Sequence, residues 1–212
     1  MVMMMKYKQI IFDVDGTLAD TEYAVLHSLQ DTIKTLTGKE TPLEELIFAL
    51  GITGEDALIK LAFPDVPAAL ELWIDYLHRY DDTVSIFPGI EEVLQTLSQA
   101  GCGFGIATSR IRDEFEQEFR RFPIRRYFDI VVCADDTAEH KPAAAPLLKY
   151  MELSGTKRNE ILYVGDSRYD RECARHAGVD FALAGWGSHL KDIDAEYRLS
   201  TPGELASVAG VR

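Results

Sequence analysis

Short apolar segments alternate with longer amphipathic segments along most of the chain. Five apolar segments are rich in β-branched and aromatic residues and are bounded by Gly, Asp or Ser; they lie at 7–14, 101–108, 129–135, 160–166 and 180–186. Such segments are typical of strands buried on both faces of a parallel sheet. Amphipathic segments suited to helices lie at 88–101, 113–122, 142–153 and 168–178. The alternation predicts an α/β fold: a doubly wound, Rossmann-like parallel sheet with helices on both faces.

The region between the first two predicted strands breaks this alternation. From Thr21 to Thr83 it contains no convincing strand, and its amphipathic stretches are separated by Gly and Pro; they lie at 22–38, 42–50, 55–63 and 67–82. We expect a helical bundle, the cap (residues 20–83), inserted into an α/β core domain formed by residues 1–19 and 84–212. Because the two connections are short, the cap can move as a unit about them.

Composition excludes several classes of protein. A formal net charge of −13 and a pI near 4.8 argue against nucleic-acid binding, which normally needs a basic surface, but not against a small anion in a local positive pocket. The three cysteines form no CxxC pair and indicate neither a disulfide framework nor a zinc site. The apolar run before Lys6 and Lys8 is too short for a signal peptide, and no segment reaches the roughly 18 apolar residues of a membrane span. We therefore expect a cytoplasmic protein without membrane partners.

Polar residues with chemical potential follow the predicted strands. They are Asp13 and Asp15 after the first, Thr108 to Arg110 after the second, His140 and Lys141 after the third, and Asp166 with Asp170 after the fourth. In doubly wound sheets, ligands bind in the crevice outside the carboxyl ends of the strands. The four groups are thus expected to form one site.

The segments "DVDGTLADT", "ATSR", "HKPAAAP" and "VGDSRYD" occur in this order. Together they resemble the motifs of the haloacid dehalogenase-type phosphohydrolase superfamily, and the helical insert resembles the α-helical cap of its C1 members. Within that superfamily the chain looks most similar to phosphoglycolate phosphatase-like enzymes. The segment "ALGITGEDAL", residues 49–58, resembles in position their substrate-specificity loop, although a plain turn between helices explains it equally well.

The chemistry of the residues supports a phosphatase. A carboxylate can attack phosphorus to form an aspartyl-phosphate, and Asp13 is the candidate nucleophile. Asp15 can protonate the leaving oxygen and then accept a proton from water. The crowded carboxylates require positive charge, which Mg²⁺ can supply through oxygen ligands. We expect Asp13, the backbone carbonyl of Asp15 and Asp166 to bind it, with Asp170 either binding through water or holding Lys141.

The remaining candidates would bind the phosphoryl group. Lys141 adds positive charge, Thr108 and the backbone N–H of Ser109 donate hydrogen bonds at the start of a helix, and Gly16 lies beside the nucleophile. These assignments predict Asp13, Asp15, Thr108 and Lys141 as catalytic residues.

The substrate is expected to be a small phosphorylated metabolite, a phosphoglycolate-like or sugar phosphate monoester. The loop at 49–58 contains no arginine to bind a carboxylate, so pyrophosphate and small sugar phosphates remain alternative substrates to phosphoglycolate. A phosphomutase of the β-phosphoglucomutase type would share the nucleophile and the metal, and a phospho-acceptor module without turnover would share the fold. The oligomeric state stays open.

Overall fold

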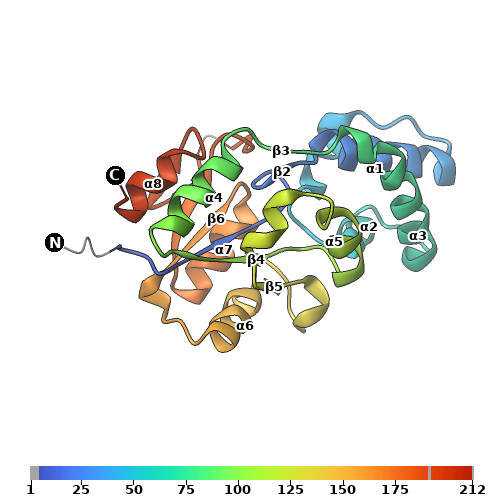
Figure 1. The fold of residues 1–212 in the computed structure, drawn as a ribbon. Helices are drawn as coiled ribbons and strands as arrows, with labels where there is room; N and C mark the ends of the chain where they lie inside the picture. The colour runs from blue at the N-terminus through green and yellow to red at the C-terminus, as the bar shows by residue number, and fades with distance from the viewer. Residues whose placement is uncertain (1–4, 191, 212) are drawn as a thin grey trace.

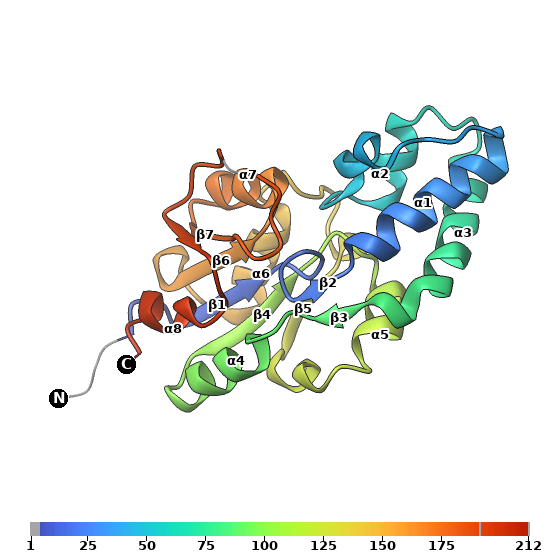
Figure 2. The same ribbon diagram turned by 90° about the horizontal axis from the view of Figure 1, so that it is seen from above.

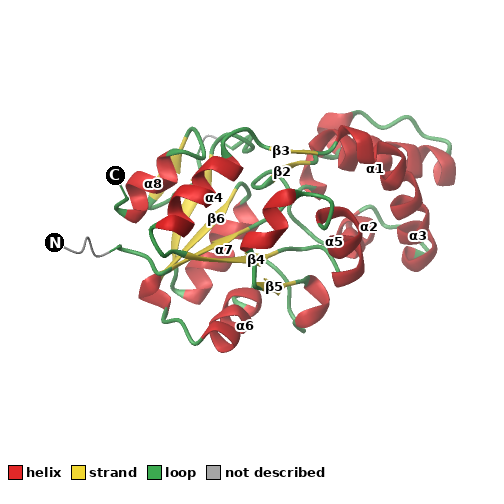
Figure 3. Cartoon of the chain, viewed as in Figure 1, coloured by secondary structure: helices red, strands yellow, loops and turns green. Residues whose placement is uncertain are grey.

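The core of the protein is a six-stranded parallel sheet. The computed structural model describes residues 5–190 and 192–211. In spatial order the strands are β5 (Ile130–Val132), β4 (Gly103–Ala107), β1 (Gln9–Phe12), β6 (Ile161–Gly165), β7 (Asp180–Ala184) and β8 (Tyr197–Leu199). Each pairs in parallel with its neighbours, and the chain crosses between them through helices, except from β7 to β8, where the described residues contain no helix (Figures 1 and 3). The predicted doubly wound α/β fold is confirmed.

Helices cover both faces of the sheet because its strands are apolar on both faces. In β1, Ile10 and Phe12 point to one face, where they join a cluster with α4 (Ile90–Gln99), α5 (Arg112–Phe119) and α8 (Glu204–Ala209). Ile11 points to the other face, packed with α6 (Ala145–Ser154) and α7 (Arg168–Ala177). The sheet therefore lies in the middle of a three-layer core.

The sequence pattern missed two C-terminal elements, β8 and α8. Strand β8 has three residues, and α8 has six. Elements this short complete barely one period of hydrophobic alternation, so they have no clear periodic signal. Short 3₁₀ turns, η4 (Pro123–Tyr127), η5 (Ala134–Asp136) and η6 (Arg158–Glu160), lie in the core loops. Across the described ranges, no helix combines the length and apolar character that a membrane span requires.

The inserted segment forms a helical unit with its own apolar interior. It consists of α1 (Glu22–Thr37), η1 (Leu43–Glu45), η2 (Ile47–Ala49), α2 (Gly54–Lys60), α3 (Val66–Leu77) and η3 (His78–Thr83). The expected helix over 42–50 is wrong, because η1 and η2 are 3₁₀ turns. Leu43, Leu46 and Ala49 recur every third residue, which matches the 3₁₀ repeat, and all three pack into the cap cluster.

The two connections between core and cap pair with each other. Strand β2 (Ala19–Asp20) lies antiparallel to β3 (Ser85–Ile86), with Ala19 opposite Ile86. Figure 2 shows both strands between the large sheet and the cap helices. The segments predicted as separate hinges thus form one two-stranded neck.

Candidate active site

The topology of the sheet brings three of the predicted groups together. Strand β1 lies between β4 and β6, so Asp13, Thr108 and Asp166, which follow these strands, meet at one edge. The hydrogen bonding between β1 and β6 continues past the end of β1, since the Asp13 N–H donates to the Val164 carbonyl at 2.9 Å. Asp13 and Thr108 are both buried.

Lys141 joins this edge from the loop before α6. Its Nζ donates to Asp13 Oδ1 at 2.7 Å and to Asp170 Oδ1 at 2.8 Å, and its side chain is almost fully buried. The hydroxyl of Tyr163 donates to the same Asp170 oxygen at 2.7 Å, and the Ser167 N–H donates to Asp170 Oδ2 at 3.1 Å. Asp170 thus holds Lys141, one of its two expected roles. Tyr163 was not predicted, because the alternation of β6 marks it only as a core residue.

The residues at this edge fit a divalent cation. Asp13, Asp166 and Asp170 each offer a carboxylate oxygen, and these atoms lie within 4.8 Å of one another. Together with Lys141 they form what we call the charge cluster. Asp13 Oδ2 is buried and has no hydrogen-bond partner among the described residues. Three carboxylates around one ammonium leave excess negative charge, and oxygen ligands suit a hard cation such as Mg²⁺.

Burial and neighbouring charges shift the pKa values of the charge cluster. Burial, opposed by Lys141 and reinforced by Asp170, raises the pKa of Asp13 to about 7. Burial and the neighbouring Asp170 and Asp13 raise the pKa of Asp166 well above its ordinary value. Burial alone would lower the pKa of Lys141, but its ion pairs with Asp13 and Asp170 raise it, so this side chain stays a cation.

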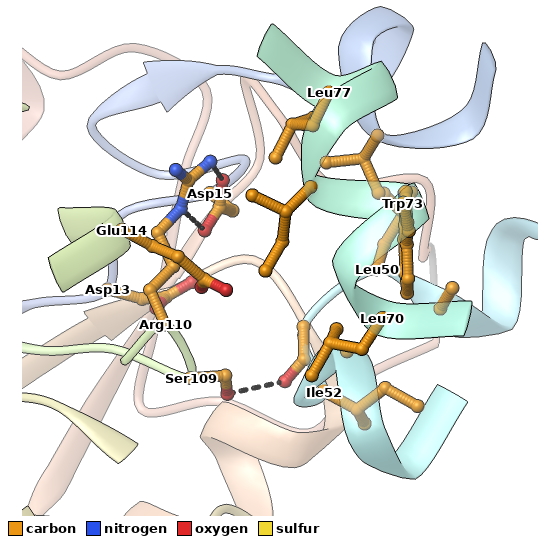
Figure 4. A pocket seen from close by; sticks show the side chains of 15 residues that line it. Asp13, Asp15, Leu50, Ile52, Leu70, Trp73, Leu77, Ser109, Arg110 and Glu114 are labelled. Carbon is orange, nitrogen blue, oxygen red and sulfur yellow. Dashed lines mark hydrogen bonds and ion pairs between the residues drawn. The ribbon is translucent and has the colours of Figure 1, made fainter. Parts of the chain in front are cut away.

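The Asp15 carboxylate is directed toward Arg110 instead of the charge cluster. Arg110 Nε donates to Asp15 Oδ2 at 2.8 Å and Nη2 donates to Oδ1 at 2.7 Å (Figure 4). Its Nη1 pairs with Glu118. Burial favours the neutral acid, yet the guanidinium outweighs it and lowers the pKa of Asp15. Only the backbone carbonyl of Asp15, the atom named in the sequence prediction, remains for a metal. Sequence analysis placed Arg110, the last residue of the "ATSR" motif, at this site but assigned it no role.

Two predicted phosphate-binding residues have further roles in the structure. Gly16 has φ +75°, and a Cβ there would lie 2.4 Å from Asp166 Oδ2, so only glycine fits. Ser109 Oγ donates to the Gly51 carbonyl of the cap at 3.1 Å. The expectation that Ser109 lies at the start of a helix is wrong: α5 begins at Arg112, and residues 109–110 form a bend before it.

A cavity of about 90 Å³ lies between the core and the cap. Its core side is formed by Asp13, Asp15, Ser109, Arg110 and Glu114. Its cap side, which we call the cap wall, includes Leu50, Ile52, Leu70, Trp73, Ile74 and Leu77. Figure 4 shows the labelled members of the two sets facing each other. The predicted site therefore opens onto the cap, and residues 49–52 and Gly54 of the loop at 49–58 contribute to the lining.

Comparison with known proteins identifies relatives of similar sequence and fold. A Caldanaerobacter subterraneus subsp. tengcongensis protein provisionally named pyrophosphatase PpaX is 33% identical over 183 residues, which cover 86% of this chain and 83% of that protein. Pyrophosphatase PpaX of Halalkalibacterium halodurans is 27% identical, covering 98% and 99% of the two chains. A crystal structure from Lactobacillus plantarum, provisionally named phosphoglycolate phosphatase, superposes with a TM-score of 0.88 at 27% identity and covers 96% of this chain and 100% of its own. The profile of the haloacid dehalogenase-like hydrolases matches residues 10–184, and the chain belongs to that family.

Proposed function

We propose that the protein is a Mg²⁺-dependent phosphatase that hydrolyses a small phosphate monoester through an aspartyl-phosphate at Asp13. The observation that supports this most directly is the state of the Asp13 carboxylate. Lys141 holds Oδ1, while Oδ2 is buried without a hydrogen-bond partner among the described residues. One oxygen is thus oriented by a cation, and the other keeps its lone pairs for phosphorus.

In the first step, Asp13 Oδ2 attacks phosphorus, and the bond from phosphorus to the leaving oxygen breaks. The electron pair of that bond goes to the leaving oxygen, which takes a proton from Asp15. Because Arg110 lowers the pKa of Asp15, this carboxylate has to take up a proton from solvent, with the loss of an Arg110 contact, before it can act as the acid. In the second step, water attacks phosphorus and gives a proton to the Asp15 carboxylate. The Asp13–phosphorus bond breaks, and phosphate leaves.

Charge at the site supports these steps. Mg²⁺, held by Asp13, Asp166 and the Asp15 backbone carbonyl, would supply positive charge to the phosphoryl oxygens. Lys141 adds a fixed positive charge beside Asp13, and Thr108, the Ser109 N–H and Gly16 would contact the same phosphoryl group. For its proton transfer, Asp15 has to exchange one of its two contacts with Arg110 for the leaving oxygen.

The test compares wild type with Asp13→Asn, which removes the nucleophile and keeps the shape of the side chain. With p-nitrophenyl phosphate and Mg²⁺, we expect the variant to lose about 10⁴-fold or more in kcat. EDTA should abolish wild-type turnover, and Asp166→Asn should need more Mg²⁺ for half-maximal rate. Substantial turnover by folded Asp13→Asn would contradict the proposal.

A second candidate is pyrophosphate hydrolysis, which the names of the PpaX relatives favour. It would use the same nucleophile, so Asp13→Asn does not distinguish the two reactions. The choice between them depends on what the cavity accepts beyond the transferred phosphoryl group.

A further inference from the structure

The cap wall differs from the core side of the cavity in having no polar side chain. Every cap residue that lines the cavity is aliphatic, aromatic or glycine, among the residues that the structure describes. The transferred phosphoryl group must lie against Asp13, so the rest of the substrate extends toward this wall. Under the proposed function, the leaving group would therefore contact this wall.

Trp73 is oriented so that it adds aromatic surface to this wall. Its only polar atom, Nε1, donates to Ser28 Oγ at 2.8 Å inside the cap. Gly54 allows the wall to pack closely, because a Cβ at this position would lie 2.8 Å from Leu70 Cδ1. The indole therefore has no donor left for a substrate and presents apolar surface.

Charges on the core side give no counter-ion for a second anionic group. Arg110 is the sole cation in the described lining, and both Asp15 and Glu118 already neutralise it. Glu114 is the remaining ionisable group near the cap wall, and burial raises its pKa. Charged or neutral, its carboxyl group cannot compensate an anion, and a buried unpaired charge is strongly unfavourable.

The adjoining cavity does not change this balance. It lies between α3, η3 and α5 and shares Arg110, Glu114, Ile74 and Leu77 with the first. Besides Arg110, its lining includes the cations Arg120 and Arg121 and the carboxylates Asp81, Glu114 and Glu118. A substrate that reached this region would still meet at least as many carboxylates as free cations.

We propose that the leaving group of the substrate is a small, uncharged, apolar alcohol that packs against Trp73, Leu70 and Ile74. This inference rests on the proposed phosphatase function and identifies its substrate class. It disfavours substrates whose second group is a carboxylate, as in phosphoglycolate, or a phosphate, as in pyrophosphate.

A matched series of substrates tests the proposal. n-Propyl phosphate, phosphoethanolamine and phosphoglycolate have leaving groups of similar length that end in a methyl, an ammonium and a carboxylate group. We expect kcat/KM for n-propyl phosphate to exceed that of the other two and of pyrophosphate by about 100-fold, since burial of a methyl group is favourable, whereas burial of an unpaired charged group loses favourable hydration. Pyrophosphate has the better leaving group, so a preference for the alkyl ester would report recognition and not intrinsic reactivity.

Ile74→Lys provides the complementary test, with Ile74→Met as its neutral control. Ile74 lines the cavity, is half-buried and belongs to none of the three hydrophobic clusters of the described chain, so either variant should fold. The added ammonium should raise the ratio of kcat/KM for phosphoglycolate over n-propyl phosphate by about 10-fold, and Met should leave it within about 2-fold. An unchanged ratio in the Lys variant would overturn the placement of the leaving group.

The outcomes separate this inference from the proposed function. If pyrophosphate, phosphoglycolate or phosphoethanolamine is the best substrate, or if the profile is flat, while Asp13→Asn is inactive, the inference fails and the phosphatase function stands. If folded wild type with Mg²⁺ hydrolyses no phosphate compound, the proposed function fails. A clear preference for n-propyl phosphate that disappears in Asp13→Asn supports both.

Discussion

The charge cluster and the cap wall face each other across one cavity and are built in different ways. In the charge cluster, Lys141 is bound to two named carboxylate oxygens at hydrogen-bond distance, and each side chain position depends on its partner. The cap wall consists of side chains whose only requirement is to be apolar and of suitable volume. Directional contacts tolerate little change, whereas packed apolar surfaces accept substitutions of similar size. Changes in the cluster should therefore affect all substrates, and changes in the wall should affect selectivity.

Removal of the lysine from the charge cluster should have the largest effect. In Lys141→Met, Asp13 and Asp170 lose their shared cation, and the phosphoryl group loses a fixed positive charge. We expect kcat to fall by about 10³-fold, and the factor should be similar for pyrophosphate and for an alkyl phosphate. Steady-state kinetics on folded protein measures this. A loss of kcat for one substrate alone would contradict the expectation that changes in the charge cluster affect all substrates.

Arg110 lies on the core side of the cavity, outside the charge cluster, and its removal should have the next largest effect. In Arg110→Met, the Asp15 carboxylate loses both hydrogen bonds that orient it. We expect kcat to fall by about 10- to 100-fold, because small displacements of a catalytic group are costly. Arg110→Lys keeps the charge without the forked geometry and should recover part of the rate. An unchanged kcat in Arg110→Met would show that Asp15 needs no such support.

Two hydroxyl groups of α1 allow a matched test of the cap itself. Ser28 Oγ accepts from the buried Trp73 indole at 2.8 Å, whereas Thr35 and Tyr76 form an exposed hydroxyl pair at 2.8 Å between the same helices. Ser28→Ala leaves a buried donor unpaired and should lower the free energy of unfolding by about 1–2 kcal/mol. Thr35→Ala should cost about 0.5 kcal/mol or less. Urea denaturation measures both free energies of unfolding. If the two variants lose the same amount, burial of the hydrogen bond between Trp73 and Ser28 does not add to stability.

Glu114 should give the smallest effect, visible as a dependence of stability on pH. Its pKa in the folded protein is raised, chiefly by burial. As the pH rises, the unfolded chain loses this proton first, so the folded state becomes less favoured until Glu114 is also ionised. Glu114→Gln removes this penalty. Its stability relative to wild type should therefore be greater at about pH 8 than at about pH 4, and thermal unfolding at the two pH values measures the difference. A difference that shrinks as the pH rises would contradict the raised pKa.

The fold was predictable because its main elements have a periodic local signal. All five predicted strands are present, and so are the helices between them, because runs of apolar residues and amphipathic repeats depend on the backbone geometry of neighbouring residues. The signal failed where elements were too short to repeat. It missed β8, α8 and the β2–β3 neck, and it could not distinguish the 3₁₀ turns η1 and η2 from a helix.

For the site, the sequence by itself determined which chemical groups stand at the strand ends, since local motifs are enough to single out Asp13, Lys141 and Asp166. Only the tertiary structure decided their partners. The contact of Asp15 with Arg110 spans 95 positions and that of Asp13 with Lys141 spans 128. Likewise, the apolar cap wall collects side chains from separate cap segments. The local pattern indicated that these groups meet at one edge of the sheet, but which side chain binds which depends on how the elements pack in three dimensions.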